Sequence, residues 1–119
     1  MFLVASGASD GHVAFNPAGT GRQERTRIVR IADETREDNL GTFPDFKSLN
    51  EVPEYGVSVG PATLADVPQL VVMLLIGAHK RQAFDRIAAA AAYECDWPST
   101  IVRDCNSYCI IADSAAAGR

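Results

Sequence analysis

The most constraining feature of this sequence is the continuous apolar run over residues 70–76, Leu-Val-Val-Met-Leu-Leu-Ile. A segment that is apolar at every position, rather than at every second one, is typical of a strand covered on both faces of a parallel sheet. The run is too short to span a membrane, which takes about 20 apolar residues. Residues 2–5 and 108–111 are two further short apolar segments, and the second is also expected to be a buried strand. The chain is therefore expected to contain a parallel sheet.

Helical segments are expected between these strands. Residues 61–66 begin with a proline, which is favoured at the first position of a helix. Residues 79–93 are expected to form a longer helix, because their apolar side chains recur at helical spacing and a run of alanines favours helix. Further helical turns are expected over residues 96–104, and Asp113-Ser114 is a candidate cap for a last helix. Strands and helices thus alternate along the chain.

This alternation predicts an α/β fold class, with a doubly wound, mostly parallel, Rossmann-like sheet flanked by helices. Residues 55–60 add one short alternating strand, so three or four strands can be counted. Because an open sheet of that size exposes an edge and a face, we expect this chain to hold only part of the sheet, without the N-terminal half. The polar stretch 16–50 is long for a connection and is expected to be functional or to hold short elements of its own.

Composition excludes several classes of function. The net charge is −4, from 11 basic and 15 acidic residues, and no basic cluster predicts binding to nucleic acid or to an anionic membrane. The arginines over residues 22–36 alternate with acidic residues and indicate a solvated face, with at most one arginine turned toward a ligand. No targeting segment and no disulfide framework are evident among the three cysteines, so a cytoplasmic protein is expected. No metal site and no nucleotide motif are present, so no cofactor is expected.

His12 is the first residue that could carry chemistry. It follows Asp10-Gly11 after the strand of residues 2–5, at the strand end where open α/β sheets bind ligands. Gly11 allows a sharp bend that exposes the imidazole, and Asp10 can orient the ring as a general acid and base near neutral pH. On this tripeptide alone, an idle histidine in an ordinary Asp-Gly turn remains the alternative.

Lys80 is the second such residue. It follows the strand of residues 70–76 and Gly77, at the expected start of a helix. Free backbone amides and a lysine at a helix start are suited to binding a phosphate. The alternative is a solvated lysine beside Arg81, and His79 is expected simply to be exposed.

Five motifs follow one another along nearly the whole chain. They are DGHVAFN at 10–16, RTRI at 25–28, DETREDN at 33–39, YGVSVGPATL at 55–64 and GAHK at 77–80. The series resembles the C-terminal half of the glucosamine-6-phosphate isomerase/deaminase family. DGHVAFN is the specific element, because the related 6-phosphogluconolactonases share DGH but continue differently. The resemblance implies isomerisation of a 2-amino-sugar phosphate with release of ammonia, a small-molecule sugar phosphate as partner and the option of a homo-oligomer.

The resemblance also implies roles for individual residues. His12 is similar to the family histidine that assists ring opening, and Asp10 to the aspartate that sets the protonation of that histidine. Lys80 is similar to the lysine that holds the substrate phosphate. These three residues are the site residues that the sequence predicts.

Three positions depart from the family pattern. Pro17 stands where the family usually has a glutamate that completes an Asp–His–Glu relay. No arginine is present near Gly41, where the family places a phosphate-binding arginine, and Val29 replaces the lysine of the allosteric members. From these differences we expect no second carboxylate beside His12, weaker phosphate binding and no allosteric regulation of the family's kind.

The family's glycine-rich phosphate loop and its proton-shuttling aspartate have no counterpart in the 119 residues. We therefore expect residues 1–119 to be the C-terminal portion of a single isomerase/deaminase-like domain and to be inactive alone, because isomerisation needs that base. A non-catalytic sugar-phosphate-binding module and the effector-sensing domain of a sugar-responsive regulator remain as alternatives.

Overall fold

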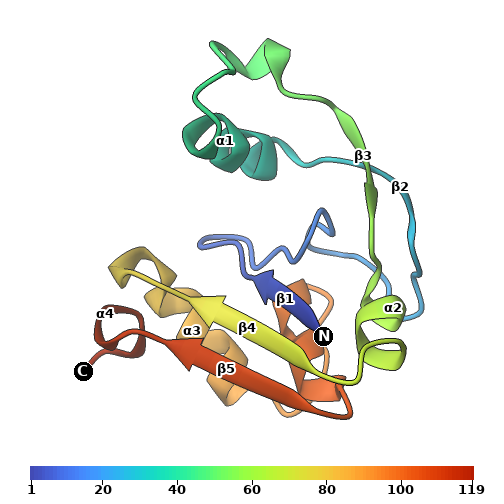
Figure 1. Ribbon diagram of the computed structural model, residues 1–119, viewed down its shortest axis with the longest axis vertical. Helices are drawn as coiled ribbons and strands as arrows, with labels where there is room; N and C mark the ends of the chain where they lie inside the picture. Colours follow the sequence, from blue (N-terminus) through green and yellow to red (C-terminus); the bar gives the residue numbers. More distant parts are fainter.

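The computed structural model describes all of residues 1–119 as an α/β arrangement (Figure 1). The strands are β1 (Phe2–Ala5), β2 (Arg27–Arg30), β3 (Tyr55–Ser58), β4 (Val71–Leu75) and β5 (Tyr108–Ala112). The α-helices are α1 (Asp33–Thr42), α2 (Pro61–Asp66), α3 (Arg81–Ala89) and α4 (Ser114–Ala117). Three 3-10 helices complete the order: η1 (Leu49–Glu51), η2 (Ala78–Lys80) and η3 (Pro98–Asp104). No helix is both long enough and apolar enough to cross a membrane.

Three strands form a parallel sheet in the order β1-β4-β5. The central strand β4 directs Val71, Met73 and Leu75 into the main hydrophobic core, where each is at most 1% exposed. This core also contains Ile87 of α3 and Ile101 of η3. The apolar run that predicted the sheet is therefore its best-buried strand, and the expected α/β class with a parallel sheet is confirmed.

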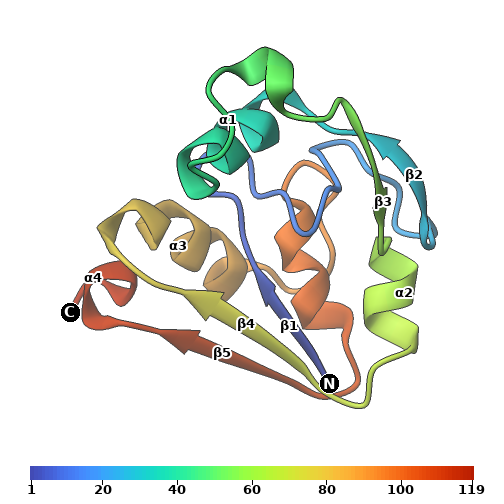
Figure 2. The same cartoon turned by 45° about the horizontal axis from the view of Figure 1, so that its top comes forward.

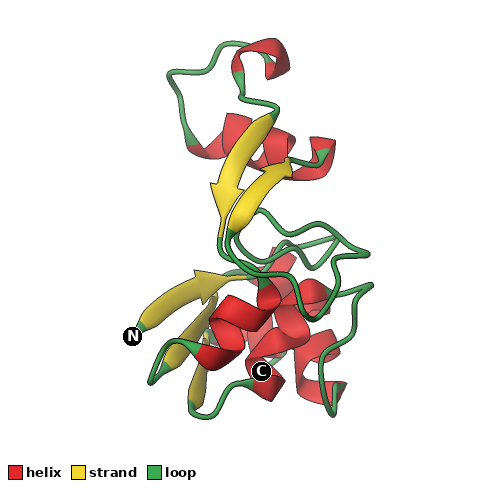
Figure 3. Cartoon of the chain, turned by 90° about the vertical axis from the view of Figure 1, so that its right-hand side faces the viewer, coloured by secondary structure: helices red, strands yellow, loops and turns green.

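The helices cover only one face of this sheet. Figure 3 shows the three strands at one side of the molecule with the helices beside them. Val4 and Ile110 pack against the core, whereas Leu3 is 63% exposed and Ile111 is 47% exposed. The expected exposed face is thus present, and β1 has a free edge because it pairs with β4 alone. The expectation of a buried strand at residues 108–111 is wrong, because β5 is an edge strand covered on one face.

The polar stretch 16–50 does hold elements of its own, as expected. β2 pairs antiparallel with β3 to form a separate two-stranded ribbon. The buried Arg36 of α1 donates hydrogen bonds to the carbonyl oxygens of Leu49 (2.8 Å) and Val52 (2.9 Å). These bonds fix α1 against the segment that leads into β3. Figures 1 and 2 show α1 facing the loop that follows β1.

The helix expected over residues 79–93 is shorter in the structure. Residues 78–80 form the turn of η2, and α3 ends at Ala89 although the alanine run continues. Ala90 is extended and buried, and its carbonyl accepts a hydrogen bond of 2.9 Å from Nε of Arg103. This tertiary contact overrides the intrinsic helix preference of alanine. The other expectations hold: α2 begins at Pro61, and the Asp113 carboxylate caps α4 by accepting the backbone N–H of Ala116 at 2.8 Å.

Candidate active site

The turn after β1 brings Asp10 and His12 into contact. Nδ1 of His12 lies 2.8 Å from Oδ1 of Asp10, and the same oxygen accepts the backbone N–H of His12 at 3.1 Å. The N–H of Gly7 closes the turn by donating to the carbonyl of His12 at 2.7 Å. A Cβ atom at position 7 would collide with both side chains of the pair. A glycine at this position therefore makes room for the Asp10–His12 contact.

The pKa of Asp10 lies below its ordinary value. Burial by itself raises this pKa, but two hydrogen bonds from His12 and the attraction of its charged ring together outweigh the burial. Asp10 is therefore ionised at neutral pH and can only accept hydrogen bonds, so Nδ1 of His12 is the donor. This leaves Nε2 of His12 as the ring nitrogen that can take up or give a proton.

The η3 segment supports the turn from behind. Gly11 adopts a positive φ of 67°, and a Cβ atom there would collide with the indole ring of Trp97. The backbone N–H of Ser99 donates to the carbonyl of Gly11 at 2.8 Å, and the hydroxyls of Ser6 and Ser99 are hydrogen-bonded at 2.7 Å. The sharp bend expected at Gly11 is therefore present and is held by long-range contacts.

Lys80 lies next to this turn. Because β1 and β4 are adjacent and parallel, the segments after their carboxyl ends meet at one edge of the sheet. Nζ of Lys80 donates a hydrogen bond of 2.6 Å to the carbonyl of Ser6. Lys80 is the last residue of η2 and immediately precedes α3, close to the predicted helix start.

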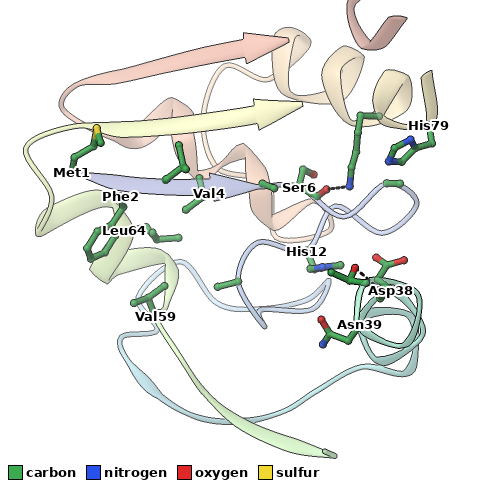
Figure 4. A pocket seen from close by; sticks show the side chains of 16 residues that line it. Met1, Phe2, Val4, Ser6, His12, Asp38, Asn39, Val59, Leu64 and His79 are labelled. Atoms are coloured by element: carbon green, nitrogen blue, oxygen red, sulfur yellow. Dashed lines mark hydrogen bonds between the residues drawn. The ribbon is translucent and has the colours of Figure 1, made fainter. Parts of the chain in front are cut away.

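His12 and Lys80 line one pocket of about 680 Å³. The loop after β1 and the segment after β4, which carry the two predicted site residues, thus line the same cavity. Its remaining polar wall comes from residues to which the sequence assigned no role: His79 of η2 and Asp38, Asn39 and Thr42 of α1. Figure 4 shows His79, Asp38 and Asn39 at one end of the pocket and Phe2 of β1 at the other. The signal that could have found them is their place in the motifs at 33–39 and 77–80, except for Thr42.

Curated relatives match almost the whole chain, although no family model matches it. The chain is 33% identical over 118 residues to a glucosamine-6-phosphate isomerase of Candida albicans, covering 99% of this chain and 46% of that protein. It is 31% identical over 109 residues to a glucosamine-6-phosphate deaminase of Shouchella clausii, covering 92% and 42%. The chain belongs to the glucosamine-6-phosphate isomerase/deaminase family. It spans less than half the length of the curated relatives it matches.

Solved structures show the same fold as this family member. A monomeric glucosamine-6-phosphate deaminase superposes with a TM-score of 0.79 at 24% identity, covering 98% of this chain and 46% of the other. A 6-phosphogluconolactonase from Trypanosoma cruzi superposes with a TM-score of 0.63 at 22% identity, covering 98% and 39%. Both structures therefore contain the α/β fold of this chain as one part of a longer chain.

The structure shows where the three residues that differ from the family pattern lie. Pro17 and Gly41 do not line the pocket, and Val29 is buried. No arginine lines the pocket either, so none of the arginines over residues 22–36 contributes a side chain to its wall. Arg36, at the centre of DETREDN, is engaged with backbone carbonyls instead. In this isomerase/deaminase family member, Lys80 is therefore the one lysine or arginine side chain of the pocket, and His12 and His79 are its two histidines.

The cysteines and the acidic residues form no metal site. No group of three side chains that could hold a metal ion is present in the structure. Cys105 is buried, and burial together with the neighbouring Asp104 carboxylate raises the pKa of its thiol to about 11. Cys105 is therefore a packed thiol, whereas Cys95 and Cys109 are exposed.

Proposed function

We propose that the pocket binds an amino-sugar phosphate such as glucosamine 6-phosphate. On this proposal the chain supplies the ring-opening and phosphate-binding groups of an aldose–ketose isomerase/deaminase. The observation that carries the proposal is the meeting of His12, which is held by Asp10, and Lys80 in one pocket at the carboxyl ends of β1 and β4. The relatives that match nearly all of this chain are named for glucosamine 6-phosphate, which supports this substrate class.

His12 acts as the general acid and base for opening the sugar ring. Opening requires a proton on the ring oxygen and the loss of a proton from the hydroxyl at C1. Nε2 is the free nitrogen of a ring whose other nitrogen is held by Asp10 at 2.8 Å. Ionised Asp10 stabilises the imidazolium that forms when Nε2 takes up a proton.

Lys80 holds the phosphate. Its ammonium group has three N–H donors, and the carbonyl of Ser6 accepts only one of them. The bond to Ser6 fixes the ammonium group at the end of β1, and two donors remain for phosphate oxygens. His79 lines the same pocket beside Lys80 and adds a second group that can donate to a phosphate.

Residues 1–119 form one portion of a single isomerase/deaminase-like domain. The free edge of β1, the uncovered face of the sheet and the apolar end of the pocket are the surfaces that the rest of such a domain would cover. The base that moves the proton between C1 and C2 belongs to that remainder, so these residues bind the substrate without turning it over. The exposed thiols of Cys95 and Cys109 fit a reducing, cytoplasmic setting.

Titration with glucosamine 6-phosphate, followed by the backbone NMR signals of the chain, tests this function. Saturable shifts are expected in residues 6–14, 38–42 and 77–80, and glucosamine without the phosphate should cause weaker ones. Shifts that are absent, or that map to the outer face of β2 and β3, would contradict the proposal. Ammonia release by the chain alone would contradict the expected lack of turnover.

A non-catalytic sugar-phosphate-binding module is the second candidate, because Pro17 occupies the position of the family glutamate. Mixing the chain with the portion of the Candida albicans relative that it does not match separates the two functions. Ammonia release by the mixture supports the enzyme. A mixture that assembles and binds the sugar phosphate without ammonia release supports the binding module.

A further inference from the structure

We propose that Asp38 recognises the protonated amino group of the substrate and thereby selects a 2-amino-sugar phosphate over its 2-hydroxy analogue. This inference rests on the proposed function, since it assigns a substrate group to the same pocket. Asp38 lies outside the residues for which the family resemblance implies a role.

Asp38 is the only acidic residue that lines the pocket. Its carboxylate makes no hydrogen bond and no ion pair within the chain, whereas Asp33 on the same helix pairs with Arg36 at 3.3 Å. Asp10 does not line the pocket, and its Oδ1 already accepts two hydrogen bonds from His12. Asp38 therefore provides the one carboxylate of this pocket that is free to bind a cation.

The position of Asp38, which is exposed, is set by the helix that carries it. Arg36 anchors α1 through hydrogen bonds to the carbonyls of Leu49 and Val52. The hydroxyl of Thr42 donates to the carbonyl of Asp38 at 2.9 Å, and both residues line the pocket one helical turn apart. In the view of Figure 4, Asp38 on α1 lies below His79 on η2, and His12 lies beside Asp38. The carboxylate thus faces the cavity from the wall opposite η2.

The charges of the two walls match a zwitterionic ligand. The ammonium group of Lys80 on η2 attracts the phosphate, and Asp38 on α1 attracts an ammonium group. An amino-sugar phosphate carries both charges at opposite ends of a short sugar chain. A hydroxyl in place of the ammonium group still donates a hydrogen bond to the carboxylate, but the attraction between two opposite charges is lost. N-acetylation removes the charge as well.

Affinity measurements on the full chain test this inference. Dissociation constants of glucosamine 6-phosphate and glucose 6-phosphate are measured by calorimetry for the wild type, Asp38→Asn and Glu37→Gln. Glu37 is the matched control, because it is exposed on the same helix turn and does not line the pocket. The wild type should bind the amino sugar about tenfold more tightly than glucose 6-phosphate, as one charged hydrogen bond provides.

Asp38→Asn should weaken binding of the amino sugar about tenfold and change binding of glucose 6-phosphate by less than about twofold. Glu37→Gln should leave both affinities unchanged, and Asp38→Glu should retain the preference. Circular dichroism checks that the variants are folded. If both sugars bind equally to the wild type, or if Asp38→Asn keeps the preference, this inference falls while the proposed function stands. If neither sugar phosphate binds, both fall.

Discussion

Nζ of Lys80 donates a hydrogen bond of 2.6 Å to the backbone carbonyl of Ser6, a residue 74 positions earlier in the sequence. This bond joins the segment after β4 to the end of β1 in the wall of the pocket. It places the ammonium group beside the turn that carries Asp10 and His12, at a fixed position before any ligand is bound. The pocket is thereby preorganised for an anionic group, which lowers the entropic cost of binding.

Replacing Lys80 with methionine should abolish most of the affinity for phosphate. The substitution keeps most of the apolar stem of the side chain but removes the ammonium group, so binding of glucosamine 6-phosphate should weaken at least about tenfold. The measurement is the shift of the ³¹P NMR signal of the ligand during titration. Arg81→Met is the control, because Arg81 is the neighbouring exposed cation and does not line the pocket. Equal losses in the two variants would show that only the general charge matters.

Replacing Gly7 with alanine should separate the Asp10–His12 pair, because the added Cβ collides with both side chains. Overpacking of this kind costs about 1 to 3 kcal/mol in the free energy of unfolding. Gly41→Ala is the control: its Cβ meets nothing within 4 Å, and alanine in α1 should stabilise the protein by up to about 1 kcal/mol. Urea unfolding of both variants provides the comparison. A Gly7→Ala protein as stable as the wild type would refute the close packing of this turn.

Gly11→Ala and Gly19→Ala separate backbone strain from packing. Both glycines have a positive φ, of 67° and 91°, so alanine at either position is strained by about 1 kcal/mol or more. Only at Gly11 does the new Cβ also collide with the Trp97 ring. Gly11→Ala should therefore lose clearly more stability than Gly19→Ala and should also change the tryptophan fluorescence. Equal losses would mean that Trp97 does not pack on the turn.

Asp10→Asn should change how stability depends on pH. The pKa of Asp10 is lowered in the folded state, so the ionised carboxylate contributes stability above its unfolded pKa of about 3.9. This contribution is lost as the pH falls through the lower, folded pKa. The wild type should therefore have the higher urea midpoint at pH 7, and the gap to Asp10→Asn should close toward pH 3. Asp45→Asn, at an exposed residue, should show no such convergence, and a constant gap for Asp10→Asn would contradict the linkage.

Local patterns in the sequence determine much of the fold. The run 70–76 contains β4, and Pro61 starts α2, because an apolar run that forms a strand and the fixed φ of proline both act over a few residues. The same holds for the turn at Asp10-Gly11-His12. Its side-chain contact spans two positions, and a glycine provides the positive φ.

Other features depend on contacts between distant segments. α3 ends at Ala89 because Arg103 binds the next carbonyl, which no local propensity predicts. β5 is exposed on one face because the helices cover only the other face of the sheet, although its apolar residues resemble those of a buried strand. Long-range packing therefore decided the extent and the burial of these elements.

The candidate site likewise depends partly on local sequence and partly on contacts between distant segments. The sequence by itself determined which strand ends carry His12 and Lys80, since each follows an apolar run directly. Only the tertiary structure decided that these residues share one pocket with Asp38 and His79. The position of Asp38 depends on the anchoring of α1 by Arg36, and that of Lys80 on the parallel pairing of β1 with β4. These positions depend on contacts between residues that are tens of positions apart in the sequence. A periodic pattern among neighbouring residues carries no information about such contacts.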